Sequence, residues 1–189
     1  MKIGLYFGSF NPIHTGHLIV ANTVLNCTNI SKIWFIVSPQ NPLKKISDLL
    51  DGSARLHLVK RATELDERMF VSDAEFNLPT PSYTYNTLKY FEDEFPENDF
   101  TLIMGSDSFS QLNLWKNYKE ILQKKIIVYQ RPEFVIPAKL ILPNIVIINT
   151  PLLNISATEI RILIKAGKSI RYLVPAAVIE EIERNNYYR

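Results

Sequence analysis

At 189 residues the chain favours a single domain, residues 1–189, and it is long enough to bury a sizeable core without disulfides or metal ions. Its composition, 47% hydrophobic and 21% charged, is ordinary for a soluble globular protein, and the net charge of +2 gives no strong bias toward nucleic acids or acidic membranes. Cys27 is the only cysteine, the start is too short for a signal peptide and no apolar run approaches a membrane span, so we expect a cytoplasmic protein without nucleic-acid or membrane partners.

Apolar runs alternate with helical patterns along the chain. The apolar runs predict strands at residues 2–7, 32–37, 69–71, 100–104, 125–129 and 145–149. The helical patterns predict helices at 15–27, 53–65, 84–95, 106–112, 115–123, 157–166 and 175–185. This order indicates an α/β fold with a doubly wound, mostly parallel sheet, helices on both faces and a small helical C-terminal portion.

The turn between the first strand and the first helix reads Gly-Ser-Phe-Asn-Pro-Ile-His-Thr-Gly-His, from Gly8 to His17. Its glycines and proline are typical of a tight turn, and the N–H groups and dipole at a helix start favour an anion. His14 and His17 lie about one helical turn apart and could both donate to that anion. We therefore expect a phosphate site. Zinc is the weaker alternative, because His57, the only other histidine, falls on a separate predicted helix.

Three polar segments follow predicted strands directly: residues 8–17, 38–45 and 105–107. In open α/β sheets, ligands bind beyond the carboxyl ends of the strands, where the strand order reverses. These segments should therefore meet at one edge of the sheet.

The turn at 8–17 resembles the signature of the nucleotidyltransferases with a His-x-x-His motif. A second motif, Ile-Ser-Ala-Thr-Glu-Ile-Arg at 155–161, resembles the Ile-Ser-Ser-Thr-x-x-Arg of the same superfamily. Ser156 and Glu159 also fit a helix capping box. The chain departs from the superfamily pattern at Ala157, where serine is usual, so one phosphate contact there comes from the backbone or is absent. The superfamily implies a Rossmann-like fold and transfer of a nucleotidyl group to a phosphorylated acceptor with release of pyrophosphate.

Further segments resemble one branch of this superfamily, the bacterial nicotinate-nucleotide adenylyltransferases, in the order of that family and over nearly the whole chain. They are Ser-Ala-Arg-Leu at 53–56, Pro-Ser-Tyr-Thr at 81–84 with Thr-Leu at 87–88, Gly-Ser-Asp-Ser-Phe at 105–109, Leu-Trp-Lys at 114–116 with Ile-Leu at 121–122, Arg-Pro at 131–132 and Arg-Tyr-Leu-Val-Pro at 171–175.

The resemblance implies adenylyl transfer from ATP to nicotinate mononucleotide, giving deamido-NAD and pyrophosphate. It implies catalytic roles for His17, His14 and Arg161. The ATP-binding residues would be Gly8, Ser9, Phe10, His14, His17, Gly105, Asp107, Ile155, Ser156, Thr158 and Arg161. The mononucleotide-binding residues would be Asn11, Lys44, Thr84, Trp115 and Arg131. Mg²⁺ would be bound mainly through the ATP phosphates, with no residue assigned as a metal ligand.

Residue chemistry supports several of these binding roles. The same residues could instead serve only in packing, helix capping or surface solvation. Trp115 offers an aromatic face to the pyridine ring, although a tryptophan on an amphipathic helix is often a core residue. Thr84 could donate to the nicotinate carboxylate, and Asp107 could accept from ribose hydroxyls or act as a helix cap. Lys44, or its neighbour Lys45, could reach the acceptor phosphate, or both could be solvated.

Other readings stay open from the sequence alone. A related enzyme could use nicotinamide mononucleotide, phosphopantetheine, or a choline- or glycerol-type acceptor. An aminoacyl-tRNA synthetase is disfavoured, because the chain is short and lacks a Lys-Met-Ser-Lys-Ser loop. A non-catalytic nucleotide-binding module is disfavoured by the presence of His14, His17 and Arg161. The sequence also leaves open whether the chain forms a homo-oligomer.

Overall fold

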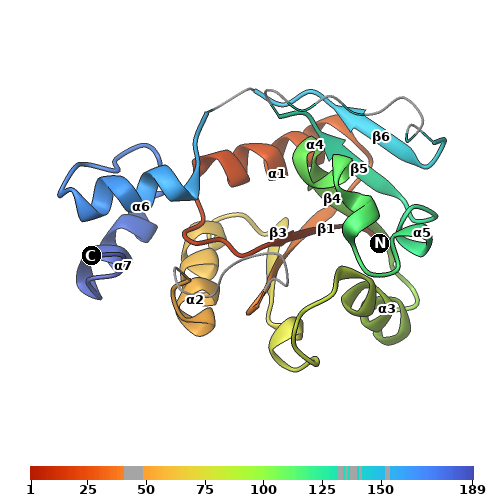
Figure 1. The fold of residues 1–189 in the computed structure, drawn as a ribbon, viewed down its shortest axis with the longest axis horizontal. Helices are drawn as coiled ribbons and strands as arrows, with labels where there is room; N and C mark the ends of the chain where they lie inside the picture. Colours follow the sequence, from red (N-terminus) through yellow and green to blue (C-terminus); the bar gives the residue numbers. More distant parts are fainter. Residues whose placement is uncertain (41–48, 132–133, 135, 137–139, 141, 152–153) are drawn as a thin grey trace.

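Six parallel strands form one sheet in the order β3-β2-β1-β4-β5-β6 (Figure 1). The computed structural model describes all residues except 41–48, 132–133, 135, 137–139, 141 and 152–153. The strands are β1 Lys2–Gly8, β2 Lys32–Val37, β3 Met69–Ser72, β4 Asp99–Gly105, β5 Ile126–Tyr129 and β6 Ile145–Ile148. Every predicted strand is confirmed to within one residue at each end, since runs rich in Ile and Val suit a sheet buried on both faces.

The helices are α1 Thr15–Cys27, α2 Gly52–Thr63, α3 Thr84–Glu94, α4 Ser106–Ser110, α5 Tyr118–Ile121, α6 Ala157–Lys165 and α7 Ala176–Arg184, with short 3₁₀ turns η2 Ala74–Phe76 and η3 Leu112–Leu114. The predicted helices occur at these places, but the prediction of 115–123 is wrong at its start. Asn117 has a left-handed φ of 57°, which breaks the helical path, so α5 begins only after it. Trp115 therefore lies in extended backbone between η3 and α5. Among the described residues, no helix has both the length and the apolarity needed to cross a bilayer.

Two layers of helices cover the sheet, as the doubly wound prediction requires. Side chains alternate between the faces along each strand, so in β1 Tyr6 belongs to one core cluster and Leu5 to the other. The cluster around Tyr6 packs under α1, α2, α6 and α7. The cluster around Leu5 packs under α3, α4 and α5. The central strands are thus buried on both faces, whereas Phe70 of β3 and Val146 and Ile147 of β6 are exposed at the two edges of the sheet.

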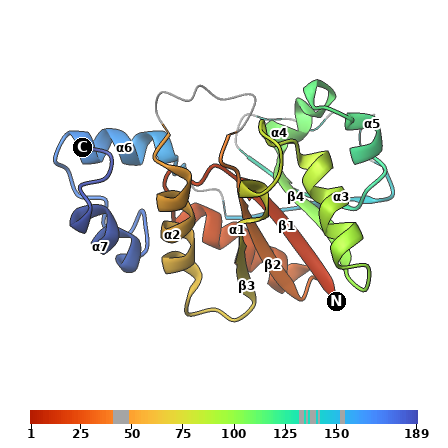
Figure 2. The ribbon, with the colours of Figure 1, turned by 90° about the horizontal axis from the view of Figure 1, so that it is seen from below.

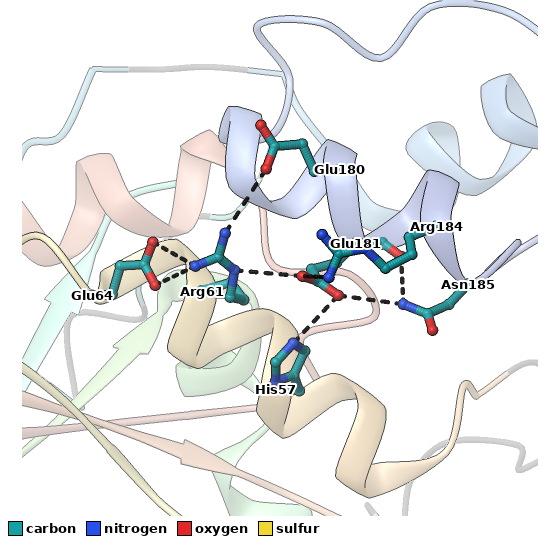
Figure 3. Close-up of polar contacts among 7 residues, drawn as sticks. All are labelled: His57, Arg61, Glu64, Glu180, Glu181, Arg184 and Asn185. Carbon is teal, nitrogen blue, oxygen red and sulfur yellow. Dashed lines mark hydrogen bonds and ion pairs between the residues drawn. The ribbon is translucent and has the colours of Figure 1, made fainter.

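The C-terminal helices α6 and α7 lie beside α2, at the β3 end of the sheet in Figure 2. A buried carboxylate, Glu181 of α7, joins α7 to α2. It accepts hydrogen bonds from Arg184 at 3.1 Å and Asn185 at 3.3 Å, and it faces His57 at 3.4 Å and Arg61 at 3.6 Å on α2 (Figure 3). Because its partners are cations and an amide, the burial of this charge is compensated.

The strand order reverses between β1 and β4, which lie side by side at the centre of the sheet. The chain runs outward from β1 through β2 to β3, and then returns to β4 on the other side (Figure 1). A doubly wound sheet opens a crevice at such a point, beyond the carboxyl ends of the strands. Those ends are Gly8 and Gly105, which are both predicted site residues.

Candidate active site

The turn after β1 wraps around a buried ring. Phe10 has a φ of 44°, and its ring packs edge-on against Tyr6 and His17. A Cβ atom at Gly8 would lie 2.7 Å from this ring, so glycine makes room for Phe10. The role of Gly8 in ATP binding stays a prediction. Phe10 as a whole is 2% exposed, so its ring belongs to the core.

Arg55 of α2 fixes the same turn through hydrogen bonds to backbone carbonyls. This role was not predicted from the sequence. The guanidinium is 1% exposed and donates to the backbone carbonyls of Ser9, Ser38, Pro39 and Leu50. It thereby ties the ends of β1 and β2 to the start of α2. Two sequence signals point to Arg55: it is a charged residue on the buried face of a predicted helix, and it belongs to the Ser-Ala-Arg-Leu segment at 53–56.

The two histidines of the motif form a stacked pair at the start of α1. Their ring centroids lie 3.7 Å apart with an interplanar angle of 26°. The backbone N–H of His14 donates to Nδ1 of His17 at 3.2 Å. Because Nδ1 accepts this bond, the neutral His17 ring carries its hydrogen on Nε2, which makes Nε2 a donor.

His14 is held in the neutral form. Its side chain is 4% exposed, and burial, together with the charge of Arg131, lowers its pKa to about 4. Gly16 leaves space for this ring, because a Cβ atom there would lie 3.0 Å from His14 Nδ1. At neutral pH His14 therefore presents an imidazole N–H and carries no charge.

A cavity of about 340 Å³ opens above the histidine pair. Among the described residues its lining consists of Tyr6, His14, Gly16, His17, Val20, Tyr129, Gln130, Arg131, Phe134, Thr150, Pro151, Asn154, Ile155 and Ser156. It brings together five predicted site residues from three separate parts of the chain: His14, His17, Arg131, Ile155 and Ser156. The N–H donors and polar groups of this lining suit a phosphorylated ligand.

The second motif forms the start of α6. Ser156 is the N-cap residue, and its Oγ accepts a hydrogen bond from the backbone N–H of Glu159 at 3.1 Å. Arg161 donates from Nη1 to the carbonyl of Asn11 at 2.9 Å, and from Nη2 to Thr158 Oγ1 at 3.5 Å. Arg161 thus joins α6 to the turn after β1, beside the cavity.

A third group lies at the end of β4. Asp107 faces Arg131, with 3.5 Å between the carboxylate Oδ1 and the guanidinium Nε. Gly105 leaves room for this pair, since a Cβ atom there would crowd both side chains. The backbone N–H of Arg131 also donates to Ser106 Oγ at 2.9 Å. Arg131 was assigned to the mononucleotide, and it lies in the same cavity as the two histidines.

Thr84 and Trp115 lie on the other face of the sheet, outside the described lining of that cavity. Thr84 is the first residue of α3, and Trp115 is half-buried against the core cluster around Leu5. Lys116 lies over the ring of Tyr83, with its ammonium 4.5 Å from the centroid, so the segments that carry Thr84 and Trp115 meet. Lys44 and Lys45 fall outside the described residues.

A buried acid, Glu75 of η2, contacts α3 close to Thr84. It was not among the residues predicted from the sequence. It is 1% exposed and accepts a hydrogen bond from Thr87 Oγ1 at 2.8 Å. Burial raises its pKa, while the hydrogen bond from Thr87 acts in the opposite direction. Glu75 therefore anchors the Thr87 end of the segment 82–87.

Comparisons with known proteins agree with this architecture. The family model described as cytidylyltransferase-like matches residues 5–162. A relative from Cytophaga hutchinsonii named "Probable nicotinate-nucleotide adenylyltransferase" is 47% identical, covering 100% of this chain and 98% of its own. A relative of the same name from Bacteroides fragilis is 42% identical over 96% of this chain and 90% of its own.

A solved structure, nicotinic acid mononucleotide adenylyltransferase of Plasmodium falciparum complexed with NaAD, superposes with a TM-score of 0.84. The match covers 99% of this chain and 97% of that chain at 22% identity, which establishes a common fold. A second structure of that enzyme, complexed with APC, gives a TM-score of 0.81 at 23% identity, over 99% of this chain and 96% of that chain. With full-length relatives at up to 47% identity, the chain belongs to the nicotinate-nucleotide adenylyltransferase family of the cytidylyltransferase-like nucleotidyltransferases.

Proposed function

We propose that this chain transfers the adenylyl group of ATP to nicotinate mononucleotide, giving deamido-NAD and pyrophosphate in NAD biosynthesis. Family membership supports this activity, because relatives that span the full chain carry the corresponding enzyme name. The observation that carries the proposal is the stacked His14–His17 pair at the start of α1, which faces a cavity that also contains the start of α6.

The reaction needs no basic side chain and no covalent intermediate. The phosphate of the mononucleotide is already ionised at pH 7, so one of its oxygens attacks the α-phosphorus of ATP directly. A new P–O bond forms as the bond to the β-phosphate oxygen breaks, and pyrophosphate leaves with that oxygen's electron pair. Catalysis then consists of positioning the two phosphates and stabilising charge around the α-phosphorus.

The histidine pair is suited to that second task. The His17 Nε2–H would donate to a non-bridging oxygen of the α-phosphate, and His14 would donate to a neighbouring phosphate oxygen. The backbone bond from His14 to His17 Nδ1 keeps the donor hydrogen on Nε2 before substrate arrives. A preorganised donor of this kind stabilises the transition state without reorganisation during the reaction.

The start of α6 would hold the leaving pyrophosphate. Ser156 accepts the capping bond with its oxygen, which leaves its hydroxyl hydrogen available to a phosphate. Thr158 and Arg161 would supply the other donors, and the helix dipole favours the negative charge. Ala157 has no hydroxyl to offer, so the contact expected there would come from backbone.

The remaining assignments concern the nucleosides. Asp107 would accept from ribose hydroxyls of ATP. On the acceptor side, Trp115 would stack on the pyridine ring, and Thr84 would donate to the nicotinate carboxylate. Asn11, Lys44 and Arg131 would contact the mononucleotide elsewhere.

The residues around the cavity fit a Mg²⁺ ion that arrives with ATP. Among the described residues, no group of three or more His, Cys, Asp or Glu side chains could hold a metal ion. The cavity lining supplies imidazoles, a guanidinium and a few neutral oxygens, whereas Mg²⁺ prefers oxygen ligands in an octahedron. Phosphate oxygens and water would therefore be its ligands, and the bound ion would neutralise charge on the triphosphate.

Release of pyrophosphate tests the acceptor. Purified protein would be incubated with ATP and Mg²⁺ and, in parallel, with nicotinate mononucleotide, nicotinamide mononucleotide or phosphopantetheine. The proposal predicts the highest kcat/KM with nicotinate mononucleotide. Comparable efficiency with nicotinamide mononucleotide would overturn the acid preference, and faster reaction with phosphopantetheine would overturn the assignment of the acceptor.

A further inference from the structure

Two tyrosines meet at the cavity from strands that are not neighbours. Tyr6 lies on β1 and Tyr129 on β5, with β4 between them (Figure 1). Their hydroxyl oxygens are 3.2 Å apart, and the residues are only 3% and 6% exposed. Gly105 of β4 allows this approach, since a Cβ atom there would lie 3.1 Å from Tyr129 Cζ.

The two tyrosine hydroxyl groups carry one more hydrogen than their hydrogen bonds use. Arg131 donates from Nη2 to the hydroxyl oxygen of Tyr129 at 3.2 Å, and a guanidinium has no acceptor to offer in return. The two phenols have two hydroxyl hydrogens, and the bond between them uses one. Within the described part of the chain, no protein acceptor takes the other. One phenolic O–H of this pair is therefore nine-tenths buried and unsatisfied, whichever tyrosine carries it.

The surroundings indicate what would satisfy it. Both tyrosines line the cavity that contains His14 and His17, and the Tyr6 ring lies edge-on to His17 with 6.1 Å between centroids. Burial and the neighbouring Tyr129 raise the pKa of Tyr6, so this phenol stays protonated at neutral pH. The Arg131 guanidinium beside the pair is a second donor; its Nε faces the Asp107 carboxylate at 3.5 Å, and its Nη2 donates to the Tyr129 hydroxyl. The ligand that matches the phenolic O–H and the guanidinium is an oxyanion.

We infer that the Tyr6–Tyr129 pair presents one phenolic O–H to a phosphate oxygen of the nucleoside triphosphate. The inference rests on the proposed function in one respect, namely that the cavity holds the nucleotide. It adds a substrate contact from two strand residues that belong to neither sequence motif.

The pair makes an unusual prediction for its variants, because either tyrosine alone can supply the hydrogen. In Tyr6→Phe, Tyr129 still accepts from Arg131 and has its own hydrogen to donate. In Tyr129→Phe, Tyr6 is released from the mutual bond and keeps its hydrogen. Only the double variant loses the phenolic donor, so the two losses should be strongly non-additive.

The experiment measures binding without chemistry. Isothermal calorimetry would give the affinity of wild type, both single variants and the double variant for a non-reactive α,β-methylene analogue of ATP with Mg²⁺, and for adenosine. Each single variant should bind the analogue within about threefold of wild type. The double variant should bind it about 10- to 100-fold more weakly, the usual effect of losing a buried hydrogen bond to a charged group. Adenosine, which has no phosphate, should bind all four proteins alike.

Controls separate this inference from stability and from the proposed reaction. Tyr90→Phe, at an exposed tyrosine of α3, should change neither affinity. A double variant whose loss equals the product of the single losses, or that loses adenosine affinity equally, would overturn the inference. So would a wild-type protein that does not bind the analogue. A wild-type protein that binds the analogue but transfers no adenylyl group would overturn the reaction alone.

A second readout does not depend on the double variant being folded. Protein labelled with 3-fluorotyrosine would be followed by fluorine NMR, with the Tyr6 and Tyr129 signals assigned from the single variants. The ATP analogue should shift at least one of these two signals, and adenosine should shift neither. Unchanged signals at saturating analogue would contradict the inference.

Discussion

The guanidinium of Arg161 donates a 2.9 Å hydrogen bond to the backbone carbonyl of Asn11, which lies 150 residues earlier in the chain. This bond joins the two sequence motifs directly, although one follows β1 and the other begins α6. It also gives Arg161 a role in the protein without substrate, in addition to the proposed contact with pyrophosphate.

Replacement of Arg161 by Met should therefore affect both stability and catalysis. We expect the free energy of unfolding to fall by about 1 to 3 kcal/mol, the scale for a hydrogen bond to a charged group. The kcat/KM for ATP should fall by about tenfold or more, because a charged phosphate donor is lost. Urea unfolding and steady-state kinetics measure the two effects. Lys165→Met removes a cation from the exposed end of α6 and should change neither; equal effects of the two substitutions would refute the role of Arg161.

His17→Ala should lower kcat by about 10²- to 10³-fold, as expected for one lost preorganised donor at a transition state. KM for ATP should change less, because other groups hold the triphosphate. The matched control is His57→Ala, which removes the histidine of α2 that faces Glu181 (Figure 3). That control should keep near-normal kcat, and a His17→Ala variant with near-normal kcat would disprove the assigned role.

Trp115→Ala should mainly raise KM for the mononucleotide. Stacking of a base on an aromatic side chain is worth roughly 1–3 kcal/mol in nucleic-acid complexes, and kcat at saturation should be less affected. Leu114→Ala, at a neighbouring side chain that is 64% exposed, serves as the control. If both variants leave the KM for the mononucleotide unchanged, the pyridine ring does not stack on Trp115.

Acid should destabilise the protein through His14. Its pKa in the folded state is about 4, below the usual 6.5, so between these values the unfolded chain binds a proton that the folded chain does not. Stability should therefore rise from pH 4 to pH 6.5 and then level off, with this residue contributing about 3 kcal/mol of the change. His14→Asn should remove that part of the slope in urea titrations. An unaltered slope would mean that His14 is not held neutral by the fold.

Glu75→Gln should show the opposite dependence on pH. Because burial raises the pKa of Glu75, the folded chain holds this proton more tightly than the unfolded chain, and stability is lost as pH rises through that range. Relative to wild type, Glu75→Gln should become more stable between pH 5 and pH 8. Its KM for the mononucleotide should also rise, since Glu75 anchors the segment next to Thr84.

Glu181→Gln is the matched control, a second buried carboxylate whose neighbours include Arg61 and Arg184 (Figure 3). It should lose stability at pH 8, because the amide cannot pair with the guanidinium groups, and it should leave the KM for the mononucleotide unchanged. Matching behaviour of the two variants would show that Glu75 has no special connection to the substrate segment.

The sheet, and the edge at which the ends of β1 and β4 lie side by side, could be predicted because they follow from local patterns. Runs of Ile and Val marked the strands, and the turn at 8–17 placed the two histidines at a helix start. The helix predicted at 115–123 is longer than α5, because periodicity does not show the left-handed backbone of Asn117. A single residue of this kind redirects the chain without altering the apolar pattern.

Other features depend on contacts that no local pattern contains. Arg55 finds its carbonyl partners on the turns after two different strands, and Glu75 finds Thr87 on the following helix. The Tyr6–Tyr129 bond requires that β1 and β5 flank a strand with glycine at that level. These partners exist only once the sheet order is fixed, so they had to be found in the structure.

Identification of the products tests the central claim most directly. Wild-type protein with ATP, Mg²⁺ and nicotinate mononucleotide would be analysed by chromatography and mass spectrometry, beside the His17→Ala variant. We predict deamido-NAD and pyrophosphate in equal amounts, formed about 10²- to 10³-fold more slowly by the variant. Pyrophosphate without the dinucleotide, or equal rates for the two proteins, would contradict the account.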